Sequence, residues 1–190
     1  MMQNVNDIRN NRPPVAATAT AVSALLPCLL FGSAAFVTWL GSRAAWLMLP
    51  TSLGVPFAFP RLRLVSFVGQ PGWNLVVELV AVVLLAAVAA WWVHRAVRRR
   101  PEANAWRVLL SAWAGILLGL VLANALRAAA AAAAIGVGPL VLFGFAFAGA
   151  LSGLLWAACA GWVCALPVAL VHRFTAPDQQ PEPAETPGGA

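Results

Sequence analysis

Long apolar stretches, separated by shorter polar segments, dominate the pattern along this chain of 190 residues. A helix needs about 20 apolar residues to cross a bilayer, and four stretches are that long. We expect helices over about residues 15–40, 75–93, 106–130 and 140–171. The first run is longer than the apolar core of a secretory signal peptide, so we expect it to remain in the mature protein. The pattern therefore predicts an all-α integral membrane protein with four transmembrane helices.

Polar tails lie on either side of this transmembrane domain, which we place at residues 15–173. Residues 1–14 form a polar N-terminal tail. Residues 174–190 are rich in proline, glycine and polar side chains, a composition typical of a disordered segment. A plain solvated tail is the simpler interpretation of this C-terminal segment, and a partner-binding peptide is the alternative.

The arginines are distributed unequally between the two sides of the predicted helices. Eight lie on the side that holds both termini, and four lie on the other. The larger group is Arg9, Arg12, Arg95, Arg98, Arg99, Arg100, Arg107 and Arg173, and the smaller is Arg43, Arg61, Arg63 and Arg127. Because positive residues are retained on the cytoplasmic side, we expect both termini in the cytoplasm.

The connection between the first two predicted helices, roughly residues 42–72, then lies outside and is about 30 residues long. It is apolar, yet it contains Pro50, Pro56, Pro60 and Pro71, and prolines so spaced exclude a helical span. Alternating residues from Arg61 onward indicate a short strand. We expect this Pro-rich loop to lie as a flap on the outer surface and to cover a cluster of polar residues at that end of the helices. A re-entrant segment and a docking face for a partner subunit are the alternatives.

One carboxylate, Glu78, interrupts the apolar stretch WNLVVELVAVVLLAAVAAWW. It would lie about 8 Å inside a helix that enters the membrane at its first tryptophan. The other members of the predicted polar cluster at this level are Asn74, Asn124, Arg127 and Arg43. Ionisable groups within a membrane often mark functional sites. We favour a structural pair of Glu78 with Arg127, or with Arg43, and a proton or solute site or an unpaired carboxyl is the alternative.

Two series of small residues recur every four positions in the third and fourth predicted helices. The series are Ser111, Gly115, Gly119 and Ala123, and Gly149, Gly153, Ala157 and Gly161. Small residues allow helices to approach closely in lipid, where hydrophobicity gives no driving force for association. We favour a packing in which these two ridges face each other, with association between copies of the chain as the alternative.

Composition narrows the classes of protein further. The chain is 62% hydrophobic and 9% charged, with a mean hydropathy of +0.82, whereas soluble domains carry about 25% charged residues. Its net charge of +6 lies on arginines that flank apolar spans, so we do not expect nucleic-acid binding. Arginine without lysine, together with abundant alanine, is typical of a GC-rich coding sequence. We therefore expect the plasma membrane, as the inner membrane of a bacterium.

No set of catalytic residues is apparent. The segment ALSGLL around Ser152 resembles the serine segment of rhomboid proteases, but no later helix supplies a histidine, and His172 lies at the far end of the same predicted helix. The sequence has no intramembrane aspartate, no CxxC motif and no glycine-rich phosphate loop. Cys28, Cys159 and Cys164 lie within apolar segments, where a thiol usually serves as a small hydrophobe. We expect no metal and no cofactor.

The arginines that follow the second predicted helix, Arg95, Arg98, Arg99 and Arg100, are expected to contact lipid headgroups. The bilayer is thus one expected partner, and another membrane protein or a second copy of the chain is the other. We hypothesise a non-enzymatic accessory or scaffold subunit. The alternative is a small oligomeric transporter or channel that uses Glu78.

Overall fold

The computed structural model describes residues 2–44, 56, 58–63, 71–100 and 103–175. These residues form five helices and no strand. The helices are α1 (Met2–Gly32), α2 (Ala34–Arg43), α4 (Gly72–Arg99), α5 (Ala105–Ala134) and α6 (Pro139–Thr175). The short strand expected from Arg61 onward is absent from the described part of that segment. The C-terminal tail expected to be disordered lies outside the described residues, apart from residues 174 and 175 at the end of α6.

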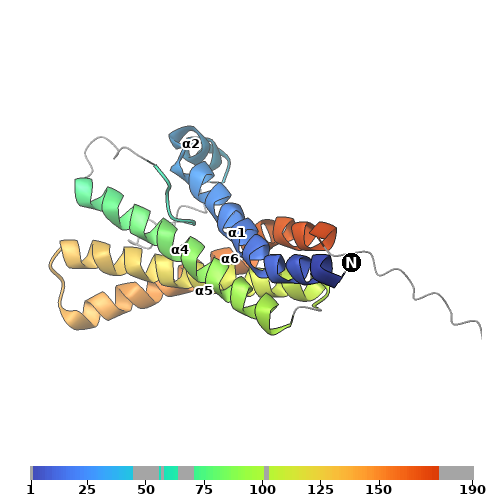
Figure 1. Cartoon of the computed structure of the whole chain (residues 1–190). Coiled ribbons are helices and arrows are strands. Elements are labelled where there is room, and N and C mark those ends of the chain that lie inside the picture. The colour runs from blue at the N-terminus through green and yellow to red at the C-terminus, as the bar shows by residue number, and fades with distance from the viewer. Residues whose placement is uncertain (1, 45–55, 57, 64–70, 101–102, 176–190) are drawn as a thin grey trace, which may run out of the picture.

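Four of these helices are long and apolar enough to cross a membrane, which indicates a multi-pass membrane protein. The apolar spans are Pro13–Gly32, Gly72–Arg99, Ala105–Ala134 and Pro139–Thr175. They form an antiparallel bundle in which α4 packs on α5, α5 packs on α6, and α1 packs on both α4 and α6 (Figure 1). The predicted set of four long apolar helices is therefore confirmed.

The first predicted helix differs from the structure at both ends. We expected one helix over 15–40, but α1 already begins at Met2 and ends at Gly32, and α2 starts after Ser33. The Ser33 side chain accepts a hydrogen bond from the Phe36 backbone N–H at 3.5 Å, so it caps the new helix. The break lies five residues beyond Pro27, which remains inside α1.

Local sequence signals account for the ends of the other helices. Arg100 ends α4 one residue before a proline, where a helical backbone is disfavoured. Asn104 caps α5 by accepting a hydrogen bond from the Arg107 N–H at 3.1 Å. Gly136, with φ of 71°, follows the end of α5, and Pro139 opens α6.

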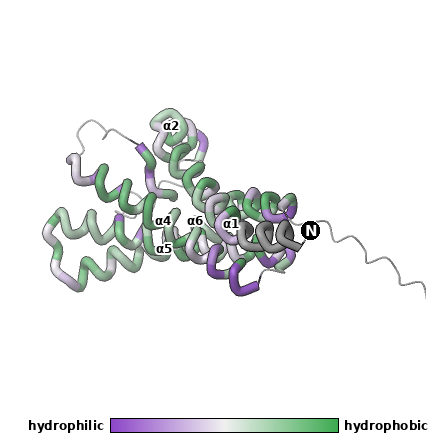
Figure 2. The backbone as a smooth tube through the Cα atoms, in the orientation of Figure 1, coloured by the Kyte–Doolittle hydropathy of each residue, from purple (hydrophilic) through white to green (hydrophobic). Residues whose placement is uncertain are grey.

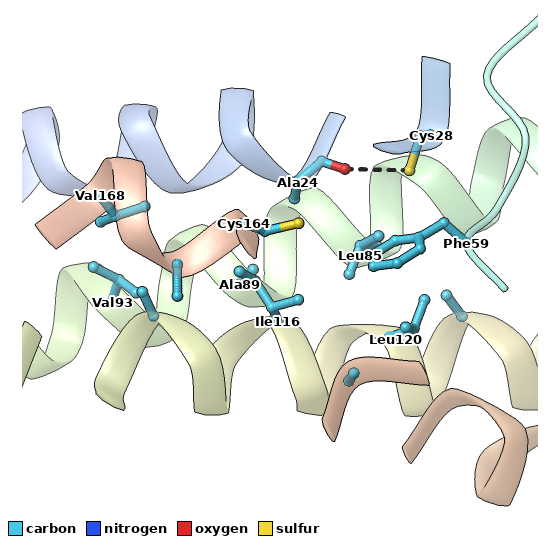
Figure 3. Close-up of a cluster of buried hydrophobic side chains, with 14 of the residues drawn as sticks. Ala24, Cys28, Phe59, Leu85, Ala89, Val93, Ile116, Leu120, Cys164 and Val168 are labelled. Atoms are coloured by element: carbon cyan, nitrogen blue, oxygen red, sulfur yellow. Dashed lines mark hydrogen bonds between the residues drawn. The ribbon is translucent and has the colours of Figure 1, made fainter. Parts of the chain in front are cut away.

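Two ends of the bundle are distinguished by their charged residues. The glutamate end, which contains Glu78, holds the start of α4 and the turn between α5 and α6. The arginine end holds the start of α1, the end of α6 and the turn between α4 and α5, where hydrophilic residues gather (Figure 2). Between them lies an apolar core to which all four long helices contribute (Figure 3). Its members include Ala24, Cys28, Leu85, Ala89, Val93, Ile116, Leu120, Cys164 and Val168.

The two ridges of small residues do not face each other, contrary to our expectation. A methyl group added at Gly119 would lie 2.9 Å from the Leu85 carbonyl oxygen, so this ridge of α5 faces α4. A methyl group at Gly153 would lie 2.5 Å from the Leu120 carbonyl oxygen, so the ridge of α6 faces another side of α5. The glycines of each ridge thus let the backbone of the neighbouring helix approach closely, and α5 is packed closely on two sides.

The remaining members of the ridges lie in the same two interfaces. Gly115 faces α4, where an added methyl group would lie 3.1 Å from the Ala89 carbonyl oxygen. Gly161 faces α5, where an added methyl group would lie 3.2 Å from the Trp113 ring. Further buried members are Ala123, Gly149 and Ala157, and the Ser111 hydroxyl is buried as well.

Candidate functional site

A salt bridge joins α4 to α5 at the glutamate end. Oε1 of Glu78 accepts hydrogen bonds from Nη2 of Arg127 at 2.7 Å and from Nε at 3.0 Å. The Arg127 side chain is 6% exposed and that of Glu78 is 21% exposed, so the pair is largely withdrawn from the surface. Of the two predicted pairings, the structure therefore forms Glu78 with Arg127.

Asn124 lies one turn before Arg127 on α5 and is fully buried. Its Oδ1 accepts a hydrogen bond from Nη1 of Arg127 at 2.7 Å, and its Nδ2 donates to the Ala58 carbonyl oxygen at 3.0 Å. Because both ends of the amide have partners, the desolvation cost of burying it is offset. Asn124 also fixes the guanidinium that faces Glu78.

Residues 56 and 58–63, here called the crossing segment, pass between the helices at this level (Figure 1). Its backbone is hydrogen-bonded to all four long helices, since Asn124 of α5 donates to the Ala58 carbonyl. The Arg61 N–H donates to Oε2 of Glu78 at 2.7 Å, the Leu62 N–H donates to the Cys28 carbonyl at 2.9 Å, and Ser152 donates its hydroxyl to the Pro56 carbonyl at 2.9 Å. The segment therefore connects α1, α4, α5 and α6.

The expectation of a flap on the outer surface is wrong for this described part of the loop. Ala58 and Phe59 are buried, and the Phe59 ring points toward Leu85, Leu120 and Cys28 inside the bundle (Figure 3). The re-entrant alternative fits these residues. The reason is physical: prolines prevent a helix, so the backbone polar groups need other partners, and polar side chains of the helices supply them. The rest of the loop, residues 45–55, 57 and 64–70, lies outside the described residues.

The end of α1 is shaped to receive the crossing segment. A methyl group at Gly32 would overlap the Leu62 carbonyl oxygen, so only glycine permits this approach. Beside it, the Phe31 ring stacks on Phe59 with ring centres 5.9 Å apart and meets the edge of Trp156 at 6.1 Å. The break between α1 and α2 thus coincides with the place where the backbone crosses.

Two further arginines of the crossing segment add positive charge near Glu78. Burial is the main influence on Arg61 and lowers the pKa of its guanidinium, whereas the carboxylate of Glu78 raises it. The pKa of Arg63 is lowered in the same way, chiefly by burial, and the charge of Arg127 adds to that effect. Guanidinium groups remain protonated in proteins, so the single carboxylate lies among several fixed positive charges.

Two predicted members of the cluster lie apart from it. Arg43 is exposed at the end of α2, where its guanidinium lies 5.1 Å from the centre of the Trp39 ring. The Glu78–Arg43 pair is therefore not formed. Asn74 lies one turn before Glu78, but no hydrogen bond joins its side chain to the cluster in the described part of the chain.

The sequence pattern did not identify Ala58, Arg61 and Ser152 as partners of the cluster. Ala58 and Arg61 contribute backbone groups, and because every residue has these groups, no sequence pattern could identify them. Ser152 was visible as a hydroxyl in an apolar helix, and it donates to the crossing segment rather than to a catalytic base. His172 lies about 30 Å along the same helix at 1.5 Å per residue, and it contacts the Ala103 carbonyl oxygen at 3.1 Å.

The remaining candidate residues occupy other positions. Arg95, Arg98, Arg99 and Arg100 are exposed at the arginine end, and Arg95 lies 5.7 Å from the centre of the Trp91 ring. Cys28 and Cys164 are buried, Cys159 is exposed, and all three are free thiols. Among the residues that the structure describes, no group of three His, Cys, Asp or Glu side chains is placed to hold a metal ion.

Comparisons with protein-family models, with curated proteins and with solved structures found no match to this chain.

Proposed function

We propose that this protein is a non-enzymatic accessory or scaffold subunit of the plasma membrane, with both termini in the cytoplasm. The observation that carries the proposal is the engagement of Glu78. Both of its carboxylate oxygens accept hydrogen bonds, from the guanidinium of Arg127 and from the backbone of Arg61. A carboxylate that served transport would have to exchange such partners for a solute or a proton.

The arrangement around Glu78 supports a structural role for a second reason. Asn124 positions Arg127 and donates a hydrogen bond to the crossing segment, so a change at Glu78 would disturb α4, α5 and the crossing segment together. Breaking a buried ion pair by removing one partner costs about 3–5 kcal/mol, because the other charge is left without compensation. Such a cost is typical of a group that holds helices in place.

A groove between α1 and α6 offers a place for the partner that a scaffold requires. It has a volume of about 530 Å³. Its wall is mostly apolar and includes small side chains at Thr18, Ala19 and Ser23. The Ser23 hydroxyl itself donates to the Cys164 carbonyl and so is already satisfied. Small residues allow a neighbouring helix to approach closely, so the proposal places a transmembrane helix of a partner protein here.

The alternative function, a small oligomeric transporter or channel at Glu78, is separated from the proposal by a double-mutant cycle. Glu78→Gln and Arg127→Gln are each expected to lower the stability of the detergent-purified protein by about 3 kcal/mol, and the double variant is expected to recover part of that loss. Thermal unfolding measures all three. If Glu78→Gln is as stable as the wild type and proton or cation flux into liposomes depends on Glu78, the transporter replaces the scaffold.

The partner surface is tested by filling the groove between α1 and α6. Thr18→Leu adds volume inside it, whereas Val83→Leu adds a methylene to an exposed side chain of α4 and serves as the control. We expect Thr18→Leu to abolish co-purification of the partner after mild solubilisation and to leave thermal stability unchanged. Equal recovery of the partner with both variants would exclude this groove as its binding surface.

A further inference from the structure

A second groove lies at the arginine end, between the last turns of α4 and the first turns of α5. Its volume is about 640 Å³. Four arginines line it, namely Arg95, Arg99, Arg100 and Arg107. Two tryptophans, Trp91 and Trp92, lie at its border and are 56% and 39% exposed, as is typical of rings at a membrane–water interface.

Within the described residues, the lining of this groove carries positive charge without a compensating carboxylate. Its described lining residues include four arginines and no carboxylate. Over residues 95–107 the chain carries five arginines and a single acidic residue, Glu102, which falls outside the described residues. The start of α5 adds the partial positive charge of a helix N-terminus. The groove therefore favours an anionic ligand.

The deeper wall of the groove is apolar and ends at an unsatisfied hydroxyl. Val97 and Val108 are buried side chains of this wall, and Leu110 extends it. Oγ of Ser111 is buried and has no hydrogen-bond partner in the described structure. Ser111 lies one turn after Arg107, so both face the same groove. Because this oxygen has no accessible surface, a ligand in the groove would contact the apolar wall rather than the hydroxyl.

Of the three consecutive arginines at residues 98–100, two line the groove and one does not. Arg99 and Arg100 line it, whereas Arg98, between Val97 and Arg99, does not. A run that served only to attract the membrane surface would use all its charges alike. The selection of particular arginines by the helix geometry points to a ligand with a defined position.

We propose that this groove binds a single anionic phospholipid, with its phosphate between the guanidinium groups and one acyl chain along the apolar wall. Guanidinium groups bind phosphate oxygens in pairs, which accounts for several arginines around one small volume. A free phosphate would leave the apolar wall unused, and a neutral lipid would leave the arginines without a counter-charge. Only the anionic lipid matches both parts of the groove. This inference is independent of the role proposed for Glu78.

The test measures retention of phosphatidylglycerol by the intact protein, using native mass spectrometry during titration in a neutral detergent. We expect one lipid bound per chain. Arg99→Gln with Arg107→Gln is expected to weaken binding roughly 25-fold, because each arginine near an anionic lipid contributes about fivefold. The matched control is Arg98→Gln with Arg173→Gln, which removes the same charge outside the groove and should change binding by less than about twofold.

Two further arms sharpen the result. Phosphatidylcholine should not be retained, because its headgroup carries no net charge, and phosphatidylglycerol should still bind to the Ser111→Ala variant. Equal losses in the Arg99/Arg107 and Arg98/Arg173 variants would overturn the proposal, because they would show attraction by net charge alone. Retention of soluble glycerol phosphate equal to that of the lipid would also overturn the proposal, because the acyl chain would then make no contribution to binding.

Discussion

The two ends of the bundle use arginine in opposite ways. At the glutamate end, Arg127 is buried, directed by Asn124 and paired with Glu78. At the arginine end, four exposed arginines border a groove whose described lining has no carboxylate. The same guanidinium thus satisfies the protein's own polar groups at one end and remains open to a ligand at the other. The role of an arginine in such a helix therefore follows from the partners of its guanidinium rather than from its charge alone.

The largest expected effect comes from breaking the close packing that holds the glutamate end together. A methyl group at Gly149 would overlap the Asn124 carbonyl oxygen, so Gly149→Leu should push α6 away from α5 and disrupt the Glu78 pair. We expect a loss of more than about 4 kcal/mol, seen as loss of folded protein in the membrane fraction. Gly144→Leu on the same helix is the control, because nothing lies within 4 Å of a methyl group there. Similar losses in both variants would contradict this explanation.

A smaller effect is expected from removing the amide that directs Arg127. Asn124→Ala leaves the Ala58 carbonyl and one guanidinium nitrogen without their partner, so it should cost about 2 kcal/mol. Asn74→Ala, one turn from Glu78 but outside the cluster, should cost less than about 0.5 kcal/mol. Thermal unfolding of the two variants compares them directly. An equal cost would mean that the polar cluster extends over Asn74.

Salt should have the smallest effect on the fold. It should weaken interactions at the arginine end more than those at the glutamate end. At 1 M salt the screening length is about 3 Å, so attraction between the exposed arginines and anionic lipid should weaken strongly. The partly buried Glu78–Arg127 pair is screened much less. We expect added NaCl to reduce phosphatidylglycerol retention while the melting temperature in neutral detergent changes by no more than about 2 °C. A melting temperature that falls in parallel with lipid retention would show that the pair is open to solvent.

The long helices and the principal ion pair could be predicted because they follow from local patterns. Apolar length defined the four spans, and the common level of Glu78 and Arg127 along their helices predicted the pair. What could not be predicted depends on three-dimensional packing. Each ridge lies against the backbone of a neighbouring helix rather than against the other ridge. The helix α5 has two neighbours, and its sequence does not say which face each neighbour covers.

The crossing segment was the least predictable part of the site. The four prolines of the whole connection indicated a loop. The position of the crossing segment inside the bundle depends on backbone groups of Ala58 and Arg61, which hydrogen-bond irrespective of side chain. The break at Ser33 was missed for a related reason. The apolar pattern continues unchanged through it, and the need for a break arises from the backbone of Leu62 passing beside Gly32.

The crossing segment is synthesised before the side chains that hydrogen-bond to it. Its Ala58 carbonyl is bonded by a side chain 66 residues later in the chain, and its Pro56 carbonyl by one 96 residues later. At typical synthesis rates the ribosome needs roughly 3–13 s to add those 66 residues. During that interval α1 and the segment emerge without the groups that will satisfy them. The later helices must therefore pack around a crossing segment that was synthesised before them. The helix α6 is made last and completes the packing.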